Sequence, residues 1–130
     1  MSTIKLQADN GKYVMAKVDN GQKGLWAIGN QLSEATSLEF VQVGGHSTGE
    51  PLRIQFKSGS EYVTLHGEAV VLDGGTAAAQ YRDFEVLWIE TNKIALKAAN
   101  GMFVSREKDG VQKLHANRTA IGNWEIFTVI

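Results

Sequence analysis

The sequence predicts an all-β protein built from three similar units, and three observations support this prediction. Short runs in which apolar and polar residues alternate, such as residues 4–8 and 53–57, are typical of half-buried strands. The 130-residue chain contains fourteen glycines but a single proline, and several glycines follow Asn or precede Ser between two such runs, as in hairpin turns. The third observation is that the pattern recurs about every forty residues, which is typical of repeat folds.

Each unit opens with an alternating strand that leads through a turn into a second strand. In the first unit the pattern comprises Ile4, Leu6, Ala8, Asn10, Gly11, Tyr13 and Val14. It aligns with Ile94, Leu96, Ala98, Asn100, Gly101, Phe103 and Val104. The middle copy, which is one residue shorter at its turn, comprises Ile54, Phe56, Ser58, Tyr62 and Val63. We therefore expect Leu6, Phe56 and Leu96 to occupy equivalent places in one core.

A third strand follows in each unit, at residues 25–28, 70–73 and 114–117. Because successive side chains of a strand point to opposite faces, two sets of equivalent positions are expected to face the core. They are Leu25, Val70 and Leu114, and then Ala27, Leu72 and Ala116. The other face carries Trp26, Val71 and His115, followed by Ile28, Asp73 and Asn117. Since three of these six residues are polar, partial exposure of Trp26 is expected.

The fourth strand of each unit begins with an aromatic residue. Phe40, Phe84 and Phe127 are spaced by 44 and then 43 residues, whereas the opening strands are spaced by 50 and then 40. An insertion at residues 44–51, just before the second unit, explains the difference. The three units thus cover about residues 1–45, 46–91 and 92–130 of one predicted domain.

Three four-stranded units have few ways to close into one fold. Propellers typically need four or more blades, and solenoids need polar capping repeats. The consistent prediction is a β-trefoil, in which six strands form a short barrel and three hairpins cover one of its ends. Closure also removes the exposed strand edges that favour aggregation.

The last unit carries several motifs that point to a family. They are an aliphatic-x-aliphatic strand, an Asn-Gly turn followed by an aromatic residue, a Leu-x-Ala-Asn-Arg strand and a closing Trp-Glu-x-Phe. This set resembles a repeat of the fascin-like β-trefoils, a family of fascins and hisactophilins that bind actin. The resemblance implies the trefoil fold and a non-catalytic module. The Gln-x-Trp signature of ricin-type trefoil lectins is absent from the sequence.

Composition and charge exclude several classes of function. Thirteen basic and 14 acidic residues leave a net charge of −1, which removes the phosphate attraction on which nucleic-acid binding usually rests. The chain has no cysteine, and therefore no disulfide, thiol nucleophile or thiolate metal site. The first residues lack the apolar stretch of a signal peptide, and the apolar runs are too short to span a bilayer. We expect a cytoplasmic protein without membrane insertion, monomeric or weakly associating.

The motifs of common catalytic and metal sites are absent as well. The sequence contains no His-Glu-x-x-His, calcium loop, Gly-x-Ser-x-Gly elbow or phosphate-binding glycine loop. We therefore expect no metal, no cofactor and no catalytic residue, and a binding protein rather than an enzyme.

Carbohydrate is the first candidate ligand, bound as in a lectin, with Trp26 as the candidate platform. The apolar face of a sugar ring packs on an exposed indole, while nearby polar groups bind its hydroxyls. The candidate site comprises Trp26, Lys23, Asn30, Asp73, His115 and Asn117. The alternative is that Trp26 covers the end of the barrel, because large aromatic residues are usually well buried. Trp88 and Trp124 are expected in the core for the same reason.

Two further interpretations remain open. A basic face for an acidic partner such as actin is expected at Lys97, Arg106, Lys108, Lys113 and Arg118. The alternative for these residues is an ordinary solvated surface, because no run exceeds two like charges. One trefoil cannot bundle filaments unaided, so carbohydrate is favoured over actin. Protein interaction or protease inhibition through the loop at residues 44–51 is the third candidate function.

Overall fold

The computed structural model describes residues 3–44, 52–74, 79–106 and 112–130, and its strands belong to one antiparallel sheet. The strands are β1 (Thr3–Ile4), β2 (Leu6–Gln7), β3 (Tyr13–Asp19), β4 (Gln22–Gly29), β5 (Leu38–Gly44), β6 (Leu52–Ser58), β7 (Glu61–His66), β8 (Ala69–Asp73), β9 (Phe84–Glu90), β10 (Lys93–Lys97), β11 (Phe103–Ser105), β12 (His115–Arg118) and β13 (Phe127–Val129). Short 3₁₀ turns precede β5, β9 and β13. They are η1 (Leu32–Glu34), η2 (Ala79–Arg82) and η3 (Asn123–Glu125). The all-β prediction is confirmed.

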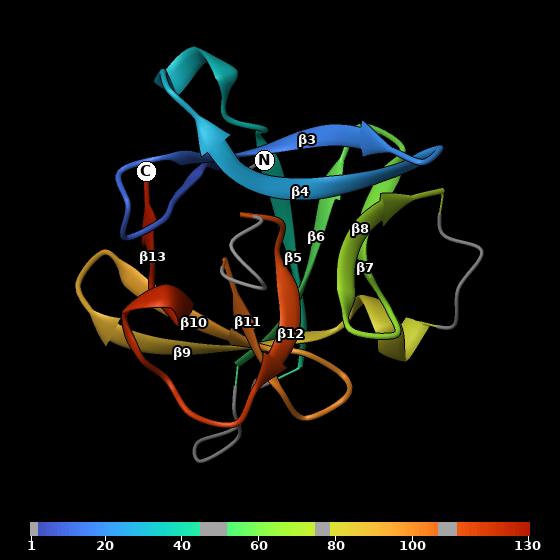
Figure 1. Ribbon diagram of the computed structural model, residues 1–130. Coiled ribbons are helices and arrows are strands. Elements are labelled where there is room, and N and C mark those ends of the chain that lie inside the picture. Colours follow the sequence, from blue (N-terminus) through green and yellow to red (C-terminus); the bar gives the residue numbers. More distant parts are fainter. Residues whose placement is uncertain (1–2, 45–51, 75–78, 107–111) are drawn as a thin grey trace.

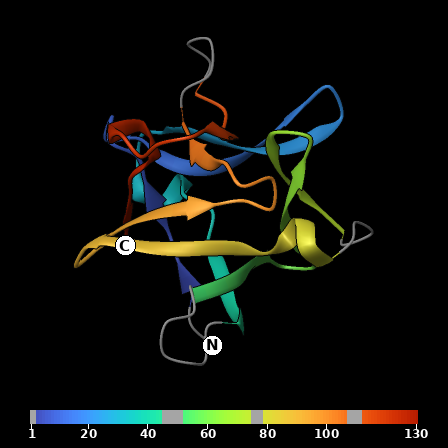
Figure 2. The same cartoon turned by 90° about the horizontal axis from the view of Figure 1, so that it is seen from below.

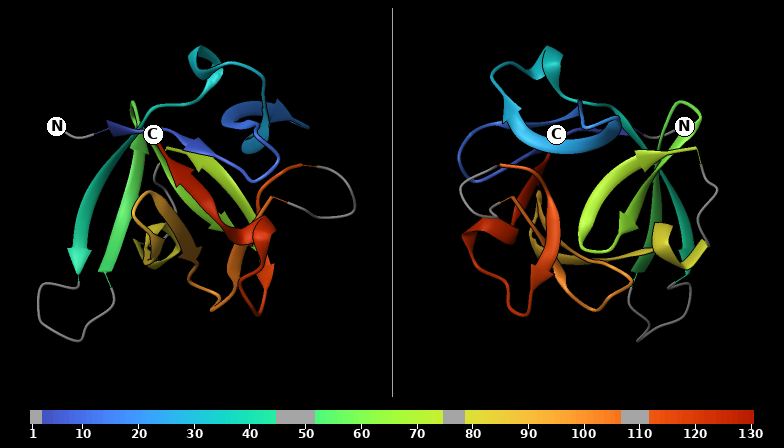
Figure 3. Two further views of the ribbon diagram at one scale, coloured as in Figure 1. Left: turned by 90° about the vertical axis from the view of Figure 1, so that its left-hand side faces the viewer. Right: turned by 45° about the vertical axis from the view of Figure 1, so that its right-hand side comes forward.

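A closed ring of strands forms the barrel. β5 pairs with β1 and β6, β9 pairs with β6 and β10, and β13 pairs with β10 and β2. β1 and β2 act as one strand, because the backbone of Lys5 between them exchanges hydrogen bonds of 3.1 and 2.9 Å with Ile130. Figure 2 shows β9 and β10 side by side, and the left panel of Figure 3 shows the same for β5 and β6.

The same register between opening and closing strands recurs in all three units. The first residue of each closing strand faces an isoleucine of the opening strand, in the pairs Leu38–Ile4, Phe84–Ile54 and Phe127–Ile94. Leu38 is therefore the equivalent of Phe84 and Phe127, and the predicted equivalence of Phe40 is wrong. Leu38 is 1% exposed, whereas Phe40 is 39% exposed. The spacing of phenylalanines misled because a leucine fills the same core place in the first unit.

Three hairpins cover one end of the barrel and form the cap: β3–β4, β7–β8 and β11–β12 (Figure 1). β8 lies between the other two, since it pairs with β4 and with β12. The third side of the cap is closed where the backbone N–H of Leu114 donates to the carbonyl oxygen of Leu25 at 2.9 Å. In the β3–β4 turn, Asn20 and Gly21 have φ values of 52° and 77°, as in the type I′ turn that Asn-Gly favours.

One buried cluster fills the space between the barrel and the cap. Leu6, Phe56 and Leu96 are 2%, 1% and 5% exposed, as expected for equivalent core positions. The inward positions predicted on the third strands are buried too: Leu25, Val70, Leu114, Ala27, Leu72 and Ala116. A cavity of only about 10 Å³ remains among these layers, about the minimum for one water molecule. Within the described ranges, no helical segment has the length and apolarity needed to cross a bilayer.

Candidate functional site

Trp26 lies within β4 and is only 8% exposed, so the predicted partial exposure of its indole is wrong. The ammonium groups of Lys17 and Lys113 lie 4.8 and 5.6 Å from its ring centroid and cover it. Gly24 leaves room for this arrangement, because a Cβ there would lie 2.9 Å from Cε of Lys113. Val71, on the same face by repeat equivalence, is 1% exposed. The centre of this face of the cap is therefore buried, although the polar residues at equivalent positions had suggested exposure.

The other predicted binding residues do not gather around Trp26. Lys23 forms a 2.6 Å ion pair with Glu61 of β7. Asn30, beyond the opposite end of β4, accepts a hydrogen bond from the ammonium of Lys12. On β12, the ring nitrogen Nδ1 of His115 bonds the carbonyl oxygen of Lys113 at 3.0 Å.

Asn117 and Asp73 complete this set and lie in different places. Asn117, also on β12, is half-buried. Asp73, at the end of β8, bonds Nε2 of His66 at 2.7 Å. The candidate site of the sequence analysis is thus dispersed over the cap, and only Asp73 adjoins the hollow described below.

Trp88 and Trp124 were expected in the core, and both expectations are wrong. Trp88 follows Val86 on the inward face of β9, but it is 60% exposed because the barrel ends at this position. Trp124 is 41% exposed in the η3 turn. The guanidinium groups of Arg106 and Arg118 lie 5.9 and 5.2 Å from the Trp124 ring centroid.

The predicted basic face comprises Lys97, Arg106, Lys108, Lys113 and Arg118, of which Lys108 lies outside the described residues. The other four cations each lie over an aromatic ring, at 5.2–6.0 Å from the ring centroid. Arg106 is also 9% exposed and ion-paired with Asp9, so its placement on an exposed face is wrong. Its charge is neutralised within the protein. The loop predicted at residues 44–51 lies outside the described residues from residue 45 onward.

A hollow of about 620 Å³ lies between the β7–β8 hairpin, the η2 turn and the turn that follows β10. We call it the β7–η2 hollow; its lining residues are Leu65, His66, Gly67, Gln80, Tyr81, Ala99 and Asn100. Tyr81 is 40% exposed there. The bond from Nε2 of His66 to Asp73 fixes the imidazole at its edge. Among the described residues, none forms a hydrogen bond with the side-chain amide of Gln80.

The walls of the β7–η2 hollow are held in place by specific contacts. The guanidinium of Arg82 in η2 lies 4.6 Å from the ring centroid of Tyr62 on β7. Next to η2, Asp83 accepts a 2.7 Å hydrogen bond from the amide of Gln55. The amide of Asn100 donates to the carbonyl oxygen of Ala116 at 2.9 Å and accepts from the backbone N–H of residue 102 at 3.0 Å. The hollow is therefore preformed, as ligand sites usually are.

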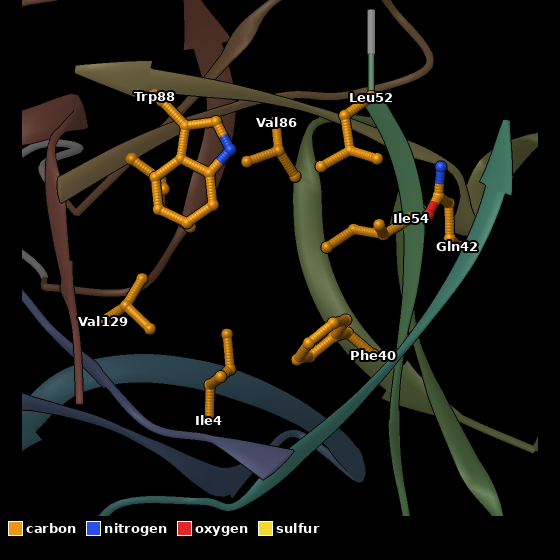
Figure 4. A pocket seen from close by; sticks show the side chains of 9 residues that line it. Ile4, Phe40, Gln42, Leu52, Ile54, Val86, Trp88 and Val129 are labelled. Carbon is orange, nitrogen blue, oxygen red and sulfur yellow. The ribbon is translucent and has the colours of Figure 1, made fainter. Parts of the chain in front are cut away.

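A second cavity, of about 140 Å³, opens at the end of the barrel away from the cap, and we call it the barrel mouth (Figure 4). Every lining residue belongs to a barrel strand, and they form three groups. The first group is the three equivalent isoleucines Ile4, Ile54 and Ile94. The second, two residues into each closing strand, is Phe40, Val86 and Val129. The rim is Gln42, Leu52 and Trp88.

Among the described residues near the β7–η2 hollow, the polar groups are not arranged as a catalytic nucleophile with its base. The hydroxyl of Thr64 lies 3.4 Å from the Asp73 carboxylate and donates to the carbonyl oxygen of Tyr62 at 3.0 Å. A nucleophilic hydroxyl would instead bond the imidazole. The described ranges contain no group of three or more His, Asp or Glu side chains that could hold a metal ion.

Sequence reasoning missed the β7–η2 hollow because its residues come from two units that only the fold brings together. A signal was present in Tyr81, an aromatic residue outside every predicted strand. Trp124 has the same property, and both are exposed. An aromatic residue outside every predicted strand was thus a better indication of exposure than the strand face on which Trp26 lies.

Comparisons with known proteins support the fold. No protein-family model matches the chain, and no curated protein sequence is significantly similar to it. The designed threefold symmetric protein ThreeFoil superposes with a TM-score of 0.73 at 10% identity, covering 98% of this chain and 97% of that one. SeviL, solved bound to the asialo-GM1 saccharide, superposes with a TM-score of 0.69 at 10% identity, covering 100% and 97%.

A third similar structure is a larger enzyme. The endo-β-galactosidase from Clostridium perfringens that releases GlcNAcα1-4Gal matches with a TM-score of 0.71 at 11% identity. The match covers 98% of this chain but 32% of the enzyme. At such identities the similarity shows the β-trefoil fold alone. The narrower resemblance to fascin-like trefoils stays a prediction.

Proposed function

We propose that the protein binds a carbohydrate without converting it, and that the β7–η2 hollow is the binding site. The observation that carries this proposal is the Tyr81 ring, 40% exposed in a preformed hollow of about 620 Å³. An aromatic ring beside a few convergent polar groups suits a sugar, whose C–H face packs on the ring while its hydroxyls are hydrogen-bonded.

Three side chains supply the polar groups. The Gln80 amide offers two donors and an acceptor, and no described residue uses them. In the neutral imidazole of His66, when Nε2 donates to Asp73, Nδ1 is an acceptor. The Asn100 amide uses one donor on Ala116 and keeps a second. Donors and acceptors on opposite sides of one hollow match the hydroxyl groups of a pyranose ring.

The similar structures support the class of ligand. SeviL was solved with a saccharide, and the Clostridium perfringens enzyme acts on a galactose-containing glycan. The same fold thus accompanies carbohydrate recognition in two other proteins. Actin binding has no comparable support, because the four described cations of the predicted basic face are ion-paired or lie over aromatic rings.

A glycan array followed by calorimetry on the strongest hit tests the proposal. Tyr81→Ala should weaken binding by about tenfold or more, since a stacking ring contributes roughly 0.5–1.5 kcal/mol beyond its buried area. Tyr81→Phe, which keeps the ring, should bind within about threefold of the wild type. Trp124→Ala is the matched control, because Trp124 is 41% exposed but lies outside the hollow.

Two outcomes would contradict this site. Equal losses for Tyr81→Ala and Trp124→Ala would mean that neither ring is specifically engaged. An array without any specific hit would remove carbohydrate as the ligand class. The non-catalytic part is tested separately, by incubating the bound glycan with the protein and following it by mass spectrometry; a cleaved or modified glycan would refute it.

A further inference from the structure

The barrel mouth is a cavity large enough for a small apolar molecule. Its volume of about 140 Å³ is similar to that of an engineered apolar cavity of about 150 Å³ that stays dry and binds benzene. The middle of the same core retains only about 10 Å³. The space is therefore confined to one end of the barrel.

The cavity has a structural cause in the broken threefold pattern of its walls. At the position two residues into each closing strand, the first unit has Phe40, whereas the others have Val86 and Val129. Two small side chains where one unit has a large one leave part of the ring unfilled. In Figure 4 the side chains of Phe40, Val86 and Val129 surround an open centre.

The walls of the cavity are apolar and its entrance is accessible. The polar side-chain groups of the lining are the Gln42 amide, which donates to the carbonyl oxygen of Gly44 at 3.2 Å, and the indole N–H of Trp88 at the rim. At the rim, Trp88 is 60% and Phe40 is 39% exposed, so solvent reaches the opening. A ligand can therefore place one end inside while another part stays in water.

We propose that the barrel mouth binds the apolar end of a small amphipathic molecule, an alkyl chain or a single ring of about six carbon atoms. A sugar does not suit this site, because burying its hydroxyl groups without partners is costly. A second copy of the chain does not suit it either, since a folded surface would cover the opening without filling the space of about 140 Å³ between the six barrel strands. The proposal is independent of the carbohydrate site, which uses other residues.

A titration with 1-alkanols from propanol to octanol, and with benzyl alcohol, tests the proposal. Methyl NMR is the readout, because Ile4, Ile54, Ile94, Val86 and Val129 all carry methyl groups at the cavity. Affinity should rise roughly fourfold for each added methylene until the chain fills the cavity, and by less from about hexanol onward. Comparison of hexanol with benzyl alcohol distinguishes a chain from a ring.

Val129→Phe is the decisive variant, because it places at the third unit the residue that the first unit already has. It should weaken hexanol binding by about tenfold, the contribution of nearly two methylene groups. Val86→Phe tests the same point from another strand, should Val129→Phe fail to fold. Val41→Phe is the matched control: Val41 is 43% exposed on β5, is not part of the lining, and should leave affinity unchanged.

Three results would overturn the proposal. One is methyl shifts located away from the barrel mouth. Another is equal affinity for hexanol in Val41→Phe and in the cavity-filling variants. The third is dimerisation, detected by sedimentation, that buries Trp88 and excludes the alcohols.

Discussion

The two ends of the barrel differ in how strictly they follow the threefold repeat. Towards the cap, equivalent positions hold similar apolar side chains, and Leu6, Phe56 and Leu96 are all at most 5% exposed. At the mouth, the ring that contains Phe40 has two valines instead, and a cavity of about 140 Å³ remains. The cap end holds the units together, so small changes in side-chain volume there should lower the stability of the protein. The mouth tolerates variation, which leaves it available for binding.

The largest expected effect comes from comparing two tryptophans. Trp26→Ala at the cap should lower the free energy of unfolding by roughly 3–5 kcal/mol, because Trp26 is 8% exposed and its removal leaves a cavity. Trp88→Ala at the mouth should change it by less than about 1 kcal/mol, since the ring is 60% exposed. Urea unfolding of both variants measures the difference. Similar values would mean that the two ends are equally important for stability.

Two arginines give the next largest effect. Arg106 has a side chain only 11% exposed, is ion-paired with Asp9, and donates to the Gln112 amide oxygen at 2.6 Å. Arg106→Ala should cost about 1.5–3 kcal/mol, as for hydrogen bonds to charged groups. Arg53→Ala should cost about 0–1 kcal/mol, because Arg53 is 49% exposed and 4.0 Å from Asp83. Thermal unfolding ranks the two, and the reverse order would show that the Arg106 network contributes little.

Filling the mouth should stabilise the protein. Val86→Phe adds apolar contacts within existing space, and cavity-filling changes commonly contribute about 0.5–2 kcal/mol. Phe56→Trp at the packed end provides the contrast, because overpacking a full core costs about 1–3 kcal/mol. Calorimetric melting temperatures should therefore move in opposite directions. A lower melting temperature for Val86→Phe would mean that the mouth cannot accept a larger ring.

The sequence predicted well the features that the repeat itself encodes. The alignment of Asn10 with Asn100 holds at the level of atoms, because each side chain accepts a hydrogen bond from the backbone N–H two residues on, at 2.9 and 3.0 Å. Glycines 11 and 101 follow with φ values of 81° and 79°. Short-range turn chemistry depends on neighbouring residues, so it can be predicted from them.

The exposure of the tryptophans could not be predicted in this way. Whether Trp26 is buried depends on Lys113, which is 87 residues away in the chain and covers it. Trp88 continues the inward face of a core strand but lies beyond the last filled layer of the barrel. The β7–η2 hollow likewise combines residues from separate units. Such features depend on long-range packing, which strand alternation does not describe.

The smallest predicted effect concerns two ion pairs, one between cap strands and one at the mouth. Lys23 of β4 and Glu61 of β7 are 2.6 Å apart and join two units, with side chains 39% and 29% exposed. A double-mutant cycle with Lys23→Met and Glu61→Gln should give a coupling of about 0.2–1 kcal/mol, typical of partly exposed pairs. The coupling should fall when salt is raised from about 0.1 to 1 M, because the Debye length shortens from about 10 to 3 Å.

The comparison pair is Lys93 and Glu90, which lie 4.0 Å apart in the β9–β10 turn with side chains 48% and 69% exposed. This pair should show almost no coupling. An equally strong coupling between Lys93 and Glu90 would show that the Lys23–Glu61 pair gains nothing from joining two units.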